Sequence, residues 1–109
     1  CYLTDETTGM INKRLLSTAK DNVVVVNTAR GEVAVESDIC NLIKNGKIFY
    51  SCDVLCNEQD IEKLKESELI KLNGQYDNLT ITPHVAGATV ESQTKALEAT
   101  IKLCKKYLS

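Results

Sequence analysis

The sequence has no tryptophan and only one phenylalanine, one proline, one methionine and one histidine in 109 residues. It contains no apolar run near the ~20 residues that a membrane-spanning helix needs, and no basic segment typical of a signal peptide opens it. We therefore expect a cytoplasmic protein without a membrane partner. Basic residues are not in excess either, because 13 Lys and Arg stand against 15 Asp and Glu. This balance argues against electrostatic binding of nucleic acid.

The five cysteines include no Cys-x-x-Cys pair. Cys40 and Cys104 fall within helix-like apolar patterns, which is typical of free thiols that pack as small apolar residues. Cys52 and Cys56 are separated by three residues, but the single histidine lies elsewhere and there is no second cysteine pair. A zinc site needs about four such ligands. We expect reduced thiols and no metal.

Three apolar segments predict strands. Residues 23–26 are four consecutive valines, and such a run without polar alternation is typical of a strand covered on both faces in a parallel sheet. A second strand is predicted over residues 48–54. The third, over residues 79–82, ends at Pro83, which lacks the N–H needed to continue a ladder.

Helical periodicity lies between these strands and at both ends of the sequence. It predicts helices over residues 6–20, 36–45 and Val90–Leu108, and a short amphipathic helix within residues 57–77. Residues 39, 42 and 43 should form the buried face of the second helix. The alternation of helix and strand predicts one α/β unit over residues 1–109, a doubly wound parallel sheet with flanking helices.

Polar side chains follow each predicted strand. Arg30 follows the first strand, Asp53 and Glu58 follow the second, and His84 follows the third. In open α/β sheets, ligands bind beyond the carboxyl ends of the strands. We therefore expect these side chains to converge on one edge of the sheet.

The segments that hold these residues resemble the D-isomer-specific 2-hydroxyacid dehydrogenases. The similarity begins at residues 3–12, includes residues 27–31, 45–48, 53–58 and 82–89, and runs to the last helix. It implies a partial Rossmann-like fold, the C-terminal half of that family's NAD-binding domain. The Gly-rich phosphate loop, the acidic residue for the adenosine ribose and the substrate domain belong to other parts of such enzymes.

The resemblance implies catalytic roles for three side chains. Arg30 would hold the carboxylate of a 2-keto acid, since a planar guanidinium donates two parallel hydrogen bonds to a planar carboxylate. His84 would protonate the carbonyl oxygen as hydride reaches carbon 2, and would act as the base in the reverse oxidation. Glu58 would pair with His84, orient the ring and favour its protonated form.

NAD is the cofactor that the resemblance implies. NADP stays open, because the residue that distinguishes the two lies upstream in the family. Gln59 stands where the family usually has proline, so we expect a differently shaped loop after Glu58. The residues implied to contact the cofactor are Tyr2, Thr7, Thr28, Ala29, Arg30, Asp53, His84 and Gly87.

Three functions stay open. The favoured one is part of a dehydrogenase for a 2-keto or 2-hydroxy acid, inactive as 109 residues alone because it has no phosphate loop and no second domain to close a cleft. The others are an NAD-sensing, partner-binding protein of the same fold and a module kept for oligomerisation. A half sheet leaves one strand edge open, which favours a homo-oligomer, with a dimer expected. The side chain of the acid cannot be read from the sequence.

Overall fold

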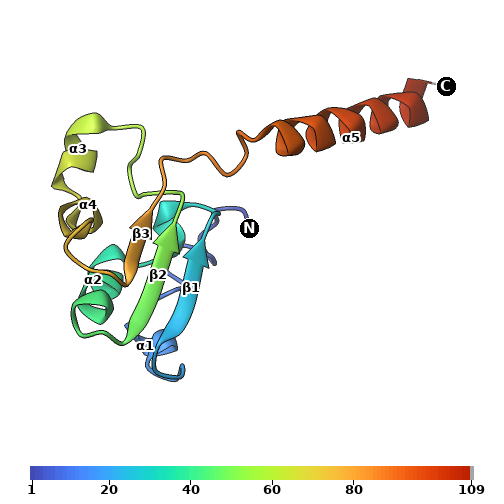
Figure 1. The fold of residues 1–109 in the computed structure, drawn as a ribbon. Coiled ribbons are helices and arrows are strands. Elements are labelled where there is room, and N and C mark those ends of the chain that lie inside the picture. The colour runs from blue at the N-terminus through green and yellow to red at the C-terminus, as the bar shows by residue number, and fades with distance from the viewer. Residues whose placement is uncertain (109) are drawn as a thin grey trace.

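A three-stranded parallel sheet forms the centre of the computed structural model, which describes residues 1–108 (Figure 1). The strands β1 (Val23–Asn27), β2 (Ile48–Cys52) and β3 (Leu79–Ile81) lie in the order β1-β2-β3. The predicted parallel α/β sheet with flanking helices is confirmed. The strand predicted over residues 48–54 ends two residues earlier, at Cys52.

The helices are short apart from the last one. They are α1 (Lys13–Leu16), the 3-10 helix η1 (Gly31–Val33), α2 (Glu36–Lys44), α3 (Ile61–Glu66), α4 (Glu68–Leu72) and α5 (Val90–Leu108).

The core lies between one face of the sheet and helices α2 and α4. Ile39 and Ile43 of α2 are almost completely buried, as the helical pattern predicts, and they pack in one cluster with Ile48 of β2. Leu69 and Leu72 of α4 join the same cluster. Removing this apolar surface from water is the main favourable contribution to folding.

The other face of the sheet is open, which corrects the prediction that residues 23–26 are covered on both faces. Val24 and Val26 are 65% and 64% exposed. Phe49, the partner of Val24 across the ladder, is exposed on the same side. The reason is that the helices pack on one side only. Helix α5 projects away from the sheet, and none of the residues Val90–Leu108 is buried (Figure 1).

Helix α1 is all that remains of the helix predicted over residues 6–20, so this prediction is wrong for most of its length. Gly9 turns the chain at a φ of 65°, and its N–H donates to the carbonyl of Glu32. Ile11 then forms a parallel bridge with Ala34. Backbone groups bonded to a distant segment cannot also form a helical ladder, so tertiary pairing overrides the local pattern.

The region of residues 57–77 contains two helices where one was predicted. Helices α3 and α4 meet at Ser67, whose hydroxyl donates to Glu36 at 2.8 Å and accepts weakly from the N–H of Ile70. A serine bonded in this way is a good first residue for a new helix. The bounds of α5 agree with the prediction.

All five cysteines are free thiols in the structure. Cys40 is buried in the core, and this burial raises the pKa of its thiol to about 12. Cys104 is exposed because α5 has no buried face. In the described part of the chain, no helix combines the length and the apolar character that crossing a membrane requires.

We predict that Ile39→Ala lowers the free energy of unfolding by about 2–5 kcal/mol, because it leaves a cavity in the core. Val24→Ala should change it by less than about 0.5 kcal/mol, because Val24 faces the open side of the sheet. Urea unfolding of the 109-residue chain measures both. Equal losses for the two variants would contradict the one-sided core.

Candidate active site

The carboxyl ends of the three strands lie at one edge of the sheet, and a turn or loop follows each of them there (Figure 1). Arg30, Asp53 and His84 lie in the segments that leave β1, β2 and β3. Glu58 lies farther along the loop that follows β2. The parallel register therefore brings the predicted groups to one side of the molecule.

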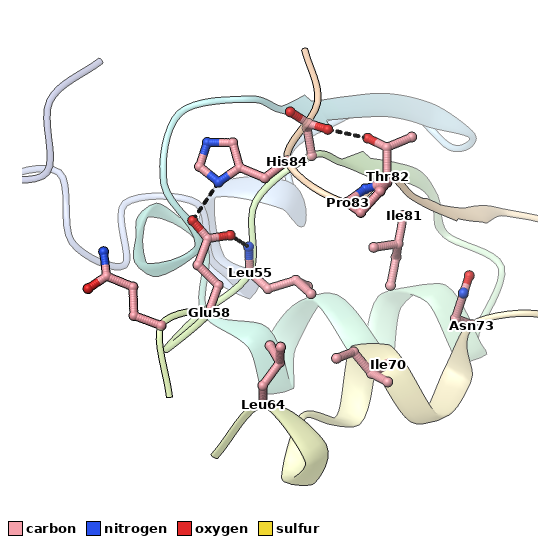
Figure 2. Close-up of a pocket in the computed structure, with 11 residues that line it drawn as sticks. Leu55, Glu58, Leu64, Ile70, Asn73, Ile81, Thr82, Pro83 and His84 are labelled. Atoms are coloured by element: carbon pink, nitrogen blue, oxygen red, sulfur yellow. Dashed lines mark hydrogen bonds and ion pairs between the residues drawn. The ribbon is translucent and has the colours of Figure 1, made fainter. Parts of the chain in front are cut away.

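Glu58 and His84 are in direct contact (Figure 2). Nδ1 of His84 lies 2.8 Å from Oε1 of Glu58, and the other carboxylate oxygen accepts from the N–H of Leu55 at 3.2 Å. The carboxylate thus bridges its own loop and the imidazole. Because Nδ1 is engaged, Nε2 is the ring nitrogen that faces away from Glu58 and can meet a ligand.

The turn that carries His84 is held by Asp53. His84 has a φ of 55°, in the left-handed region that non-glycine residues seldom adopt. The Asp53 carboxylate accepts three hydrogen bonds from this turn, from the Thr82 hydroxyl at 2.5 Å and from the N–H groups of Val85 and Ala86 at 2.9 Å each. A strained conformation persists where its surroundings fix it in this way.

Asp53 is buried, with 5% of its surface exposed. The hydrogen bond from the Thr82 hydroxyl, with those from the backbone of Ala86 and Val85, lowers the pKa of Asp53 below its usual value, and burial opposes this shift. Hydrogen bonds to a carboxylate favour its charged form. Asp53 is therefore a charged anchor beneath the turn.

The turn that carries Arg30 is shaped by Asn27, a buried residue at the end of β1. Its amide nitrogen donates to the carbonyl of Arg30 at 2.9 Å, and its amide oxygen accepts from the N–H of Ala29 at 3.1 Å. The Arg30 side chain is exposed, and Nη1 donates to the carbonyl of Ala29 at 2.6 Å. No role for Asn27 was predicted from the sequence, although a polar residue directly after four valines is a signal that could have indicated one.

The Arg30 turn and the Glu58 loop are in backbone contact. A Cβ atom added to Gly31 would lie 2.1 Å from the carbonyl carbon of Leu55 and 2.2 Å from the nitrogen of Cys56. Only glycine fits such an approach. Next to it, the Glu32 carboxylate accepts from the N–H of Asn57 at 3.1 Å. Neither contact of Gly31 and Glu32 follows from local spacing, so no role for these two residues was predicted from the sequence.

Glu58 borders two hollows in this edge. One, of about 620 Å³, also contacts His84 and has apolar walls from Leu64, Ile70 and Ile81 (Figure 2). The other, of about 290 Å³, contacts Arg30. Arg30 and His84 thus border different hollows, with Glu58 between them. A guanidinium and an imidazole–carboxylate pair at one edge can bind an anion and move a proton.

The residues implied to contact a cofactor lie in three places. Thr28 and Ala29 line a third hollow, of about 290 Å³, beside β1. This volume is near the lower end of the range for ligand sites. Tyr2 and Thr7 form an N-terminal turn in which the Thr7 hydroxyl donates to the Tyr2 carbonyl at 2.8 Å. Gly87 follows the His84 turn and has open space around it.

Within residues 1–108, no group of three or more His, Cys, Asp and Glu side chains is placed to hold a metal ion.

Residues 1–86 match the family model described as D-isomer specific 2-hydroxyacid dehydrogenase, NAD binding domain. The chain is 36% identical over 95 residues to Dehydrogenase efuE from Hormonema carpetanum, covering 86% of the chain and 22% of that protein. It is 27% identical over 108 residues to a hydroxypyruvate reductase from Blautia hydrogenotrophica, covering 99% of the chain and 32% of that protein.

A solved structure also resembles the chain, that of D-lactate dehydrogenase from Aquifex aeolicus complexed with NAD and lactic acid. The TM-score is 0.73 at 31% identity, and the match covers 99% of this chain and 35% of that one. The three-stranded sheet with its helices is therefore a Rossmann-like portion of a larger fold. The chain spans about a third or less of the length of these relatives.

We predict that Gly31→Ala separates the Arg30 turn from the Glu58 loop, because the new methyl group would overlap backbone atoms of Leu55 and Cys56. Overpacking of this kind costs about 1–3 kcal/mol, which urea unfolding measures. Gly87→Ala is the matched control, since open space surrounds that position. If Gly31→Ala is as stable as Gly87→Ala, the backbone contact does not exist.

The Asp53 anchor should depend on pH. Because its pKa is lower in the folded chain than in the unfolded one, its stabilisation is fully present above the ordinary Asp value of about 3.9 and is lost as the pH falls through the folded value. We expect the wild type to exceed Asp53→Asn in stability at about pH 6, with the difference shrinking toward about pH 2.5. Urea unfolding across this range measures it, and a difference that grows toward acid pH contradicts the account.

Proposed function

The chain belongs to the D-isomer specific 2-hydroxyacid dehydrogenase family, and we propose that the protein containing it transfers a hydride between NAD(H) and a 2-keto or 2-hydroxy acid of D configuration. In this proposal the chain is the C-terminal half of the NAD-binding domain. The observation that supports it most is the 2.8 Å contact between His84 and Glu58, at the sheet edge that also carries Arg30.

Arg30 binds the substrate in the proposed reaction. Its guanidinium can donate two parallel hydrogen bonds to the carboxylate of the acid. The Asn27 amide holds the backbone on both sides of the Ala29–Arg30 peptide bond, which limits where the guanidinium can reach. The exposed side chain would exchange its bond to the Ala29 carbonyl for bonds to the substrate.

His84 moves the proton in the proposed reaction. With Nδ1 on Glu58, the proton on Nε2 is the one placed to move to the carbonyl oxygen of a 2-keto acid during reduction. Glu58 stabilises the imidazolium and fixes the plane of the ring. In the oxidation direction, neutral Nε2 takes the proton from the hydroxyl group. A second anchor, from Glu58 to the N–H of Leu55, keeps this carboxylate in place.

The nicotinamide ring, when bound, supplies or accepts the hydride. In this proposal Thr28 and Ala29 contact one ring of the cofactor, because they line a cavity of about 290 Å³ beside the end of β1. The other proposed cofactor contacts are Tyr2, Thr7, Arg30, Asp53, His84 and Gly87. The 109 residues contain no Gly-rich phosphate loop, so other parts of the polypeptide would hold the pyrophosphate.

The partners in this proposal are a small 2-keto or 2-hydroxy acid and a second copy of the protein. The acid follows from the charge of Arg30 and the proton transfer assigned to His84. The homodimer is proposed from the edge of β1, which has a neighbour on one side only within residues 1–108 and would pair with a second copy wherever no further strand of the same domain covers it. The acid is a proposal about the whole protein.

The proposal predicts that the full-length protein reduces a 2-keto acid with NADH. His84→Gln should lower kcat by about 10²–10⁴-fold, the usual contribution of a general acid. Arg30→Lys should lower kcat/KM by about 10–10²-fold, because a charged pair of hydrogen bonds is lost. Arg14→Lys, an exposed arginine of α1, is the matched control and should change neither constant.

Steady-state kinetics with a panel of 2-keto acids measure these effects. If the wild type binds NADH but reduces no acid, the protein is an NAD-sensing protein and not a dehydrogenase. Full activity of His84→Gln would show that His84 is not the group that transfers the proton.

A further inference from the structure

Asp53 places a buried carboxylate directly beneath the turn that carries His84. We propose that Asp53 is a positioning residue for proton transfer, which holds residues 82–86 so that Nδ1 of His84 meets Glu58 and Nε2 faces the substrate. This role rests on the proposed function. It differs from the cofactor contact that the family resemblance implies for the same residue.

The His84 turn has few other attachments to the body of the protein. Residues 82–89 are all exposed, and Pro83 has no N–H to donate. The N–H of Thr82 reaches the carbonyl of Cys52, but the N–H of His84 bonds within the turn, to Thr82. Beyond the end of β3, the turn is therefore tied to the body chiefly by Asp53 and by the Glu58 contact.

The positive φ of His84 makes such an anchor necessary. A histidine at a φ of 55° relaxes to a commoner conformation unless neighbouring groups hold it, and this relaxation would swing the imidazole away from Glu58. Asp53 fixes the chain on both sides of His84. Its Oδ1 accepts from Thr82 and Val85, and its Oδ2 accepts from Ala86.

Asp53 is itself rigidly placed. Its N–H donates to the carbonyl of Asn27 at 3.0 Å, which extends the β1–β2 contact by one residue. Asp53 thus links the end of β1, the end of β2 and the turn after β3. The three donors bond to both carboxylate oxygens, whereas an asparagine side chain has only one oxygen that can accept a hydrogen bond. Its NH₂ group would face an N–H of the turn without bonding to it.

The test uses the full-length protein with Asp53→Asn, and with Asp77→Asn as a control that removes an exposed carboxylate from the opposite end of β3. Three quantities are measured: kcat with a 2-keto acid, the Kd of NADH, and the ¹⁵N resonances of the His84 ring. We expect Asp53→Asn to shift the ring resonances and to lower kcat on the order of 10²-fold, as for a misplaced catalytic group. Because Asp53 is also among the proposed cofactor contacts, the loss of kcat at saturating NADH should exceed any rise in the Kd of NADH.

Two results would overturn the proposal. Unchanged ring resonances show that Asp53 does not position His84. A weaker Kd for NADH that accounts for the whole loss of activity assigns Asp53 to the cofactor alone. If the wild type reduces no 2-keto acid, the proposed function fails, and the ring resonances still decide whether Asp53 holds the turn.

A milder pair of variants keeps the test valid if Asp53→Asn does not fold. Thr82→Val removes one of the three donors at an exposed position, whereas Thr82→Ser retains the hydroxyl. We expect a smaller shift of the His84 resonances and a smaller loss of kcat for valine, with recovery for serine. Equal behaviour of valine and serine contradicts the proposal.

Discussion

The register between β1 and β2 is the constraint on which the other features depend. Val23 pairs with Ile48 and Asn27 with Cys52, so both strands end together. This alignment places Gly31 against the backbone of Leu55 and Cys56, and it lets the N–H of Asp53 reach the carbonyl of Asn27. A slip of one strand by one residue would turn the buried face of that strand outward and separate the two turns. The core and the candidate site therefore share one structural cause.

Local sequence patterns predict the parts of the fold that local forces decide. The strands and α2 follow from apolar runs and helical periodicity, and α5 begins and ends at the predicted residues. Two predictions fail where distant contacts decide. The helix over residues 6–20 is replaced by backbone bonds from Gly9 and Ile11 to the segment after β1. Val24 and Val26 lie on an open face, because burial depends on what packs against a strand as well as on its composition.

In the candidate site, too, some residues could be predicted from the sequence and others could not. Residue types at the strand ends identified Arg30, Glu58 and His84, and the structure brings Glu58 and His84 into contact. The residues that hold the turns were harder to find. The side chain of Asn27 bonds to the backbone of its own turn, and Gly31 lies against the backbone of the loop after β2. Candidate groups can be read from the side chains that follow the strands, and their roles are implied by the family resemblance, whereas the positioning residues emerge only with the three-dimensional arrangement.

We propose that this edge of the sheet serves hydride transfer to carbon 2 of a 2-keto acid. To test this, the full-length protein is incubated with NADH that carries deuterium at both C4 positions of the nicotinamide and with a panel of 2-keto acids, and the products are analysed by mass spectrometry and chiral chromatography. We expect a D-2-hydroxy acid that carries deuterium on carbon 2. A product of L configuration, or no deuterated hydroxy acid from any member of the panel, would contradict it.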